Sequence, residues 1–328
     1  MKVLVNGIGN IGTTMLGVLN QFRVELDLSY IYARKNNLAA WNQIELEILR
    51  DLGIEIVHPD YTPISNIIDN VDYIFDCTSI GHGLKNKTWY QSLDNLKGCS
   101  AQGSEQGFGI PFMTGINDES IRGSKYVQIV SCNTHSLAAI LKAFAGDGLD
   151  NLAEADFVVV RRCEDIGNNQ RLVNANVVSR HLNSSVGTHH AVDILDLYRC
   201  VGLTPRVTSS DITTPSQLMH SVRFNIKTIN PIQTEISGPF LSSTDKFDSN
   251  VIFELGRRYG FMGRIYSHAI IVSNNLLVEK SCVKGWAFVP QEGCTILSSI
   301  HAFLLQTQHP QATELMSTLA TSLIKPIW

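Results

Sequence analysis

The fold prediction rests on Lys2-Val-Leu-Val-Asn-Gly-Ile-Gly-Asn-Ile-Gly12. An apolar run leads into three glycines spaced as G-x-G-x-x-G, and a helical pattern follows from Ile11 to Phe22. Gly7, Gly9 and Gly12 would permit a tight turn, close approach to a pyrophosphate and close helix–strand packing. Because the motif stands between a predicted strand and a predicted helix, it indicates a dinucleotide-binding βα unit rather than an ordinary glycine-rich turn.

Further strand patterns follow in the first part of the chain. They lie within 28–33, 54–57 and 71–78 and at the start of 98–105, and the last two end beside glycines. The carboxyl ends of parallel strands form the ligand crevice of a doubly wound sheet. We therefore expect an α/β fold with an N-terminal Rossmann domain over residues 1–132, in which Thr78 contacts the cofactor.

The second of these strands ends in Arg34 and Lys35. An NAD-binding site usually has an acidic residue near this point for the ribose hydroxyl, whereas basic side chains suit the extra phosphate of NADP. The pair therefore favours NADP, or the use of both NAD and NADP. A solvated basic loop is the alternative interpretation.

A candidate nucleophile lies in Val127-Gln-Ile-Val-Ser-Cys-Asn-Thr134. The apolar run predicts a buried strand, and the residues from Ser136 to Ala145 predict a helix with an apolar stripe. Cys132 would then lie at a strand-to-helix junction, where free backbone N–H groups favour a thiolate. The alternative is a buried structural thiol, which is common for cysteine in apolar segments.

The chain changes character after this helix. Longer strand patterns at 155–162, 217–227 and 266–273 are accompanied by fewer helices, and 168–186 is polar and loop-like. This predicts a second, α+β catalytic domain over residues 133–294 with a mainly antiparallel sheet. Residues 295–328 read as helices that pack back on the cofactor domain.

A cysteine nucleophile needs a base, which must come from elsewhere in the chain. His220 stands at the start of a strand pattern and is one candidate, while His189 and His190 open an amphipathic helix and could bind an anion. Arg161 and Arg162 end an apolar strand, where they could hold a phosphate or carboxylate or pair with neighbouring acidic residues. No acidic or cysteine ligand lies at metal-site spacing beside the histidines, so we predict no metal.

Composition limits the classes of function. The 328 residues are 44% hydrophobic and 17% charged, with a net charge of −4, as expected for a soluble globular protein with no nucleic-acid or membrane partner. No apolar run approaches the ~18 residues of a membrane span, and no signal-peptide pattern is present. Seven cysteines without a C-x-x-C pair suggest neither a disulfide framework nor a zinc site. A cytoplasmic protein is therefore expected.

Taken together, these features resemble the archaeal-type (class II) glyceraldehyde-3-phosphate dehydrogenases. The resemblance runs in order along nearly the whole chain. It is carried by Val5–Gly12, Asp76-Cys-Thr78, Gln102-Gly-Ser-Glu105, Val130–Thr134, Val160-Arg-Arg162, His189-His190 with Asp193, Leu218-Met-His220 and Pro290-Gln-Glu292.

The resemblance implies a role for each matching residue. Cys132 would be the nucleophile and His220 its general base. Substrate contacts would come from Ser131, Asn133, Thr134, His189 and His190, with Arg161 beside the phosphate-binding region, and cofactor contacts from Asn10, Ile11, Gly103, Ser104, Arg162 and Gln291. A homotetramer that oxidises glyceraldehyde 3-phosphate with inorganic phosphate and NAD or NADP, giving 1,3-bisphosphoglycerate, would be expected.

The chain departs from the family pattern at three places. His135 follows Cys-Asn-Thr where the family commonly has a second threonine, Ser104 replaces a glycine, and Gly293-Cys-Thr-Ile-Leu follows the Gln-Glu pair. These departures leave open a related dehydrogenase for another phosphorylated aldehyde or a semialdehyde. A cofactor-binding protein without dehydrogenase activity, with Cys132 as a redox sensor, is a further alternative.

Overall fold

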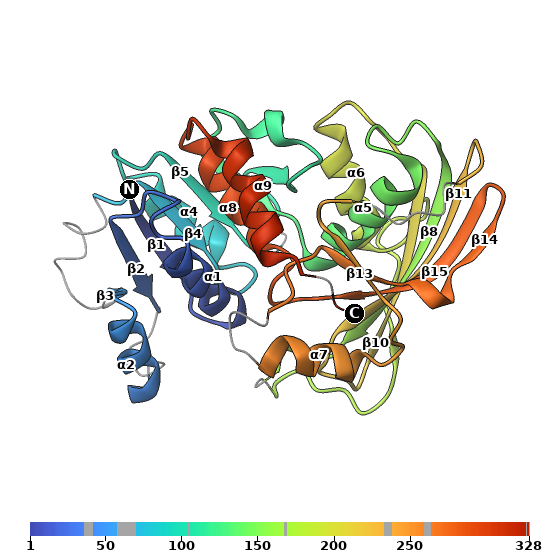
Figure 1. Cartoon of the computed structure of the whole chain (residues 1–328), viewed down its shortest axis with the longest axis horizontal. Coiled ribbons are helices and arrows are strands. Elements are labelled where there is room, and N and C mark those ends of the chain that lie inside the picture. Colours follow the sequence, from blue (N-terminus) through green and yellow to red (C-terminus); the bar gives the residue numbers. More distant parts are fainter. Residues whose placement is uncertain are drawn as a thin grey trace. The chain divides into compact units, whose positions relative to one another are not determined.

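The computed structural model describes residues 1–328 except 36–41, 58–69, 104, 167–168, 233–237, 259–263, 326 and 328. The chain divides into two compact units (Figure 1). The first comprises Met1–Val130 and Ile296–Ser317, and the second comprises Ser131–Thr295 and Thr318–Trp328. No helix in the described part is long and apolar enough to cross a membrane.

The first unit is built on a seven-stranded parallel sheet in the order β3-β2-β1-β4-β5-β7-β6. Its strands are β1 (Lys2–Asn6), β2 (Tyr30–Arg34), β3 (Glu55–Val57), β4 (Tyr73–Asp76), β5 (Gly98–Ala101), β6 (Ile110–Phe112) and β7 (Tyr126–Ile129). Its helices are α1 (Asn10–Gln21), α2 (Gln43–Asp51), α4 (Gly83–Tyr90), the 3₁₀ turn η2 (Asp118–Ile121) and α8 (Ile296–Gln306). The expected doubly wound sheet is confirmed.

Helices cover both faces of this sheet, which explains why its strands are almost continuously apolar. Tyr73 and Phe75 on β4 both pack against Phe303 of α8, with ring centroids 5.1 and 5.8 Å apart. Ile74, which points to the opposite face, shares a buried cluster with Tyr90 of α4. Successive strand residues therefore contribute to two different cores.

The glycine turn after β1 lies directly against the end of β4. Gly7 has φ +94°, and a Cβ there would lie 2.7 Å from the carbonyl carbon of Cys77 and from the amide nitrogen of Thr78. A Cβ on Gly12 would lie 2.0 Å from the Gly7 oxygen. Side chains at these positions would force the two loops and the start of α1 apart, so the turn requires glycine.

The second unit contains an eight-stranded mixed sheet in the order β12-β13-β15-β11-β8-β10-β9, with β14 paired to β15. Its strands are β8 (Leu152–Arg162), β9 (Val177–Val178), β10 (Val207–Thr214), β11 (His220–Thr228), β12 (Leu241–Thr244), β13 (Ala269–Val272), β14 (Leu277–Glu279) and β15 (Cys282–Val289). The β8–β10 and β12–β13 pairs are parallel, and the other pairs are antiparallel.

The helices of the second unit include α5 (Cys132–Ala145), α6 (His189–Arg199) and α7 (Ser249–Arg258), together with the 3₁₀ turn η4 (Ser273–Asn275). Helix α5 contacts α6 and strands β8, β11, β13 and β15, while α6 contacts β10. A further helix, α9 (Ala312–Leu323), follows α8 along the chain. The first turns of α5 and α6 carry Cys132 and the two histidines, so their packing positions these side chains.

Local structure differs from the sequence expectation at a few elements. Helix α5 begins at Cys132 rather than Ser136, because the Ser131 side chain accepts a hydrogen bond from the Thr134 N–H and caps the helix. Strand β6 was not expected from the sequence, since three residues are too few for a clear periodicity.

One buried histidine makes stability depend on pH. His268 is fully buried, and neither ring nitrogen has a hydrogen-bond partner among the described residues. Its ring stacks on Phe240 at 4.9 Å between centroids and meets His135 edge-on at 4.9 Å. Burial, followed by the charges of His135 and Lys142, holds the pKa of His268 well below its ordinary value.

We therefore expect the free energy of unfolding to fall as pH drops below about 6.5. In this range the His268 side chain binds a proton in the unfolded chain but stays neutral when it is buried in the folded protein. Urea unfolding across this range would measure the slope. His268→Phe should reduce the slope by up to about 1.4 kcal/mol per pH unit. His181→Gln, at an exposed position, is the control, and an unchanged slope in the His268 variant would contradict the prediction.

Candidate active site

Cys132 is the first residue of α5 and is partly exposed. The Ser131 hydroxyl oxygen accepts the Thr134 N–H at 3.1 Å, and the two hydroxyls lie 2.8 Å apart. The Thr134 hydroxyl in turn lies 3.4 Å from Asp193 on α6. The cap therefore fixes the first turn, which places the Cys132 sulfur at the positive end of the helix.

His220 begins β11, and its Nδ1 accepts the backbone N–H of Arg162 at 2.8 Å. A ring nitrogen that accepts a hydrogen bond carries no proton, so neutral His220 carries its proton on Nε2. The end of β8 thus sets both the orientation and the tautomer of this imidazole.

Gln291 completes a cluster with His220 and Cys132. Its Nε2 lies 2.6 Å from His220 Nε2 and 3.9 Å from the Cys132 sulfur. Two N–H donors would face each other at the shorter contact, whereas turning the amide by 180° presents Oε1 as an acceptor. Oε1 otherwise lacks a hydrogen-bond partner among the described residues, which favours this second orientation.

The surroundings of Cys132 favour its thiolate. The pKa of Cys132 is lowered well below its ordinary value, first by a hydrogen bond from the Cys294 thiol and then by the hydrogen bond and charge of His220, with a smaller effect of Arg162. These effects outweigh burial, which acts in the opposite direction. Burial and the neighbouring Cys132 raise the pKa of Cys294, so Cys294 keeps its proton.

Arg162 is buried, and both terminal nitrogens of its guanidinium contact protein groups. Its guanidinium pairs with Glu292 at 3.2 Å and with Asp165, and it also donates to the Leu218 carbonyl oxygen at 3.3 Å. The sequence left open whether the arginine pair binds a ligand or neighbouring acidic residues. For Arg162, the neighbouring acidic residue Asp165 is a partner.

Arg161, His189 and His190 form a second cluster around Asp211 on β10. The Arg161 guanidinium lies 3.9 Å from Asp211, and His190 Nε2 lies 3.5 Å from the other oxygen of that carboxylate. The rings of His189 and His190 are 3.9 Å apart at the N-terminus of α6. These groups share one site although Asp211 is distant in sequence.

Charges in this cluster are unequal. Burial lowers the pKa of His190 to about 4 and also lowers the pKa of His189, so both are neutral near pH 7. Burial opposes ionisation of Asp211, but hydrogen bonds from His190 and Ser179 hold its pKa at about 2. Arg161 is partly exposed and carries the positive charge of the cluster.

Ligand atoms of His189, His190 and Asp211 lie within 4.8 Å of one another, as in sites that can hold a metal ion. The sequence analysis missed this grouping because it considered only ligands near the histidines in sequence. The positive charge of Arg161 next to Asp211 opposes a cation there and favours an anion. The prediction that no metal is bound stays a prediction.

Two residues of these clusters escaped the site prediction. Asp211 lies on the same buried face of β10 as Val207 and Ser209, so a charged residue on the buried face of a strand was the available signal. Cys294 was noted only as part of a departure from the family pattern, and no local pattern places it beside Cys132.

The predicted cofactor residues of the first unit surround the glycine turn. Asn10, Ile11 and Gly12 form the first turn of α1, whose cap residue Gly9 makes no side-chain cap bond. A Cβ on Gly9 would meet nothing within 4 Å among the described residues, and the same holds for Gly103. This leaves backbone N–H groups and open space beside the turn, as a pyrophosphate requires. Ser104 lies outside the described residues.

Thr78, Arg34 and Lys35 already have partners in this unit. Thr78 donates its backbone N–H to Asp76 at 2.9 Å. Arg34 Nη1 donates to Asn6 Oδ1 at 2.9 Å, and its guanidinium lies over the Trp89 ring. Lys35 forms an ion pair with Glu45. Of the predicted cofactor residues, Arg162 and Gln291 belong to the second unit, within the clusters described above.

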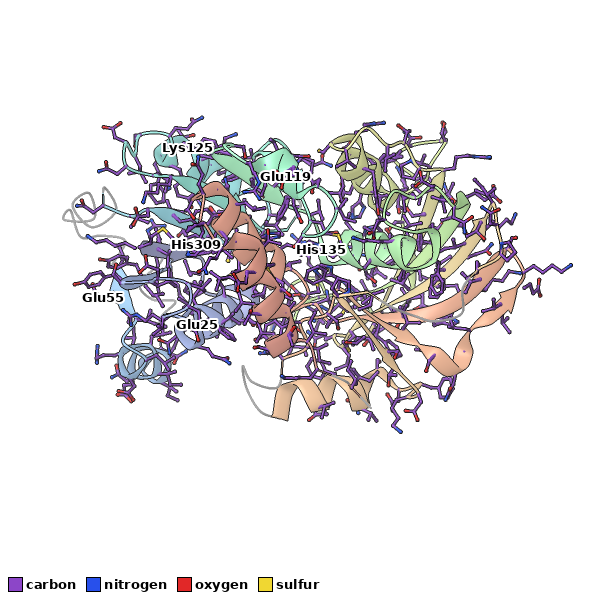
Figure 2. All side chains as sticks on the ribbon, turned by 45° about the horizontal axis from the view of Figure 1, so that its top comes forward. Glu25, Glu55, Glu119, Lys125, His135 and His309 are labelled. Atoms are coloured by element: carbon purple, nitrogen blue, oxygen red, sulfur yellow. The ribbon has the colours of Figure 1, made fainter. Side chains whose placement is uncertain are left out.

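His135 lies in the core of the second unit, on the helix that carries the nucleophile (Figure 2). It is fully buried, and its Nδ1 lies 3.0 Å from the Ser131 carbonyl oxygen. The ring also packs against His268. His135 is therefore a polar contact along the helix.

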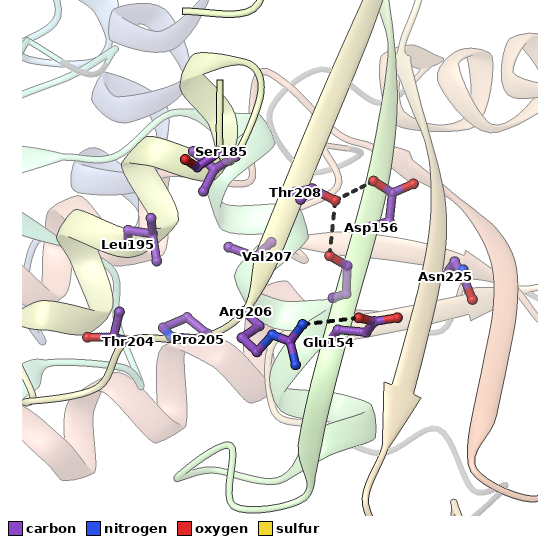
Figure 3. A pocket seen from close by; sticks show the side chains of 12 residues that line it. Glu154, Asp156, Ser185, Leu195, Thr204, Pro205, Arg206, Val207, Thr208 and Asn225 are labelled. Atoms are coloured by element: carbon purple, nitrogen blue, oxygen red, sulfur yellow. Dashed lines mark hydrogen bonds and ion pairs between the residues drawn. The ribbon is translucent and has the colours of Figure 1, made fainter. Parts of the chain in front are cut away.

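A pocket of about 440 Å³ lies elsewhere in the second unit, between β8, β10 and α6 (Figure 3). Its described lining residues include none of the predicted site residues. The polar groups in it pair with each other, since Arg206 lies 3.7 Å from Glu154 and Thr208 donates to Asp156 at 2.5 Å. The charged side chains of Glu154, Asp156 and Arg206 therefore already have protein partners.

Comparison with known proteins supports the resemblance drawn from the motifs. The chain is 28% identical over 251 residues to a glyceraldehyde-3-phosphate dehydrogenase of Thermococcus kodakarensis, covering 72% of this chain and 69% of the relative. It is 24% identical over 328 residues to that of Sulfurisphaera tokodaii, covering 92% and 91%, and 26% identical over 249 residues to that of Thermococcus sibiricus, covering 72% and 69%. No protein-family model matches the chain. The resemblance to archaeal-type enzymes is confirmed at low identity and good coverage.

The lowered pKa of Cys132 predicts how it reacts with alkylating agents. We expect alkylation by iodoacetamide, followed by mass spectrometry of Cys132, to remain fast at about pH 7, where an ordinary thiol is mostly protonated. Cys294→Ala removes the main hydrogen bond to the thiolate, so its pH profile should shift to higher pH. Cys294→Ser keeps a donor and should shift less, and identical profiles for the two variants would count against this role of Cys294.

Proposed function

We propose that the chain is an NAD(P)-dependent dehydrogenase that oxidises glyceraldehyde 3-phosphate to 1,3-bisphosphoglycerate with inorganic phosphate. The observation that carries the proposal is the thiolate-favouring arrangement of Cys132 at the start of α5, with His220 and Gln291 around it. Similarity to enzymes of this name over most of the chain supports the same substrate.

The first step is attack of the Cys132 thiolate on the aldehyde carbon, which forms a thiohemiacetal. The developing oxyanion needs a donor, and the proton on His220 Nε2 supplies one in exchange for its contact with the Gln291 amide. Because Arg162 donates its N–H to Nδ1, His220 is held in the tautomer that can donate at Nε2. This supports a donor role, whereas the general-base role implied by the resemblance requires a free Nε2 lone pair.

Oxidation then converts the thiohemiacetal into a thioester on Cys132. A bound nicotinamide would supply the hydride acceptor for this step. The open glycine turn and uncapped start of α1 support pyrophosphate binding in the first unit. Inorganic phosphate attacks the thioester carbon and the C–S bond breaks. The acyl phosphate is released, and the Cys132 thiolate is regenerated.

Phosphate groups of the substrate and of inorganic phosphate need positive charge and N–H donors. Arg161 supplies charge, and the N-terminus of α6 with His189 and His190 supplies donors. The second cluster is therefore our candidate phosphate-binding site. The Asp211 carboxylate contacts Arg161 and His190 and holds both side chains in place. It does not bind the anion itself.

The deciding experiment is the initial rate of cofactor reduction with glyceraldehyde 3-phosphate, with NAD or NADP, and with or without inorganic phosphate. We expect turnover that depends on phosphate. Cys132→Ser should reduce the rate by at least about 10³-fold because the hydroxyl is a far weaker nucleophile, while cofactor binding persists. Turnover without Cys132, or without any need for phosphate, would overturn the proposal.

Two substitutions of His220 distinguish a hydrogen-bond donor role from a general-base role. Glutamine can donate a hydrogen bond but cannot act as a base, whereas alanine does neither. If His220 acts as a donor, His220→Gln should retain about tenfold or more activity over His220→Ala. Equal losses in both variants, measured as kcat at saturating aldehyde, would instead support the general-base role.

Phosphate recognition by Arg161 predicts a change in substrate preference. Arg161→Gln should raise KM for glyceraldehyde 3-phosphate by about tenfold or more, with little effect on the unphosphorylated glyceraldehyde. Arg206→Gln, an exposed arginine in the Figure 3 pocket, is a matched control. An equal rise in KM for both aldehydes would show that Arg161 does not bind the substrate phosphate.

A further inference from the structure

Two of the seven cysteines, Cys132 and Cys294, meet in the second unit. The Cys294 thiol forms a side-chain hydrogen bond with the Cys132 sulfur. Cys294 lies in Gly293-Cys-Thr-Ile-Leu297, the segment that follows the Gln291-Glu292 pair. The mechanism proposed above uses the Cys294 thiol only as a hydrogen-bond donor.

The fold holds Cys294 in a tight turn after β15. The backbone N–H groups of Gly293 and Cys294 both donate to the Pro290 carbonyl oxygen, at 3.3 and 2.9 Å. A Cβ on Gly293 would lie 2.0 Å from the Ile265 carbonyl oxygen, so the turn is pressed against the neighbouring backbone. The same turn presents Gln291 at 3.9 Å from the Cys132 sulfur. The Cys294 thiol therefore stays beside Cys132 without a large backbone movement.

The two sulfurs differ in exposure, as expected if an oxidant attacks Cys132 and Cys294 then forms a disulfide with it. Cys132 is partly exposed at a helix N-terminus, which makes it accessible to small oxidants and favours its reactive thiolate. Cys294 is fully buried, so dissolved oxidants reach it less readily than its neighbour. An oxidised Cys132 sulfur would therefore meet Cys294 before a second oxidant molecule arrives.

We propose that Cys132 and Cys294 form a reversible intramolecular disulfide when a peroxide oxidises Cys132. The Cys132 thiolate attacks one peroxide oxygen, the O–O bond breaks, and hydroxide leaves, giving a sulfenic acid. The Cys294 sulfur then attacks the sulfenic sulfur, the S–O bond breaks, and the hydroxyl leaves with the Cys294 proton as water. The two thiols lose two electrons in total, and the peroxide takes them up.

The disulfide would block the nucleophile and protect it from irreversible oxidation to sulfinic acid. A dithiol reductant would restore both thiols by exchange. Formation of the bond does not require dehydrogenase activity. The loss of turnover that it causes rests on the function proposed above.

Peptide mapping tests this bond directly. Tryptic peptide 126–142 contains Cys132, and peptide 285–328 contains Cys294, each as its single cysteine. The full-length protein would be treated with stoichiometric hydrogen peroxide, quenched with N-ethylmaleimide and digested without reduction. We expect a linked pair of these peptides whose mass is two hydrogens below their sum and which separates after dithiothreitol.

Variants supply the controls. Cys294→Ser cannot form the link, so sulfinic acid at Cys132 should accumulate about tenfold faster than in the unaltered chain. Cys200→Ser, at a partly exposed cysteine, should retain the link. Absence of the link in the unaltered chain, with equal rates of sulfinic acid formation in the Cys294 variant, would overturn the proposal. Because the readout is mass, a linked chain without dehydrogenase activity would overturn only the proposed function.

Discussion

The candidate active site depends on the buried side chain and backbone of Arg162. Its backbone N–H fixes Nδ1 of His220, and its guanidinium pairs with Glu292 in the turn that also carries Gln291 and Cys294. One residue at the end of β8 thereby connects the start of β11 with the segment after β15. A buried guanidinium without its carboxylate partner would be strongly destabilising. Loss of Glu292 would therefore also disturb the contacts that Arg162 makes with His220.

Sequence reasoning succeeded where structure is determined locally. The βα unit from Lys2 to Gln21 follows from an apolar run, a glycine turn and a helical period that are adjacent in the chain. The position of Cys132 after β7 and that of His220 at the start of β11 follow from similar local patterns. The fold class and the parallel first sheet could therefore be predicted.

Contacts between distant segments could not be predicted in the same way. Asp211 joins His190 and Arg161 only because β10 pairs with β8 and α6 packs on β10. The approach of Cys294 to Cys132 likewise depends on a turn after β15 and on the start of α5. No hydrophobic period or residue spacing predicts contacts between such distant segments. The sequence therefore indicated most residues of the site but not all of their partners. Their roles in a reaction stay predictions.

Under the proposed function, the glycine turn and the basic residues at the end of β2 lie in a different unit from the nucleophile. The sulfur, the imidazole and the cluster around Asp211 belong to Ser131–Thr295, whereas the glycine turn and the basic end of β2 belong to Met1–Val130. Under the proposed function, exchanging Arg34 and Lys35 would alter which dinucleotide is preferred without changing Cys132, His220 or the cluster around Asp211. If that function holds, selection or engineering could change the electron acceptor and the carbon substrate in separate steps.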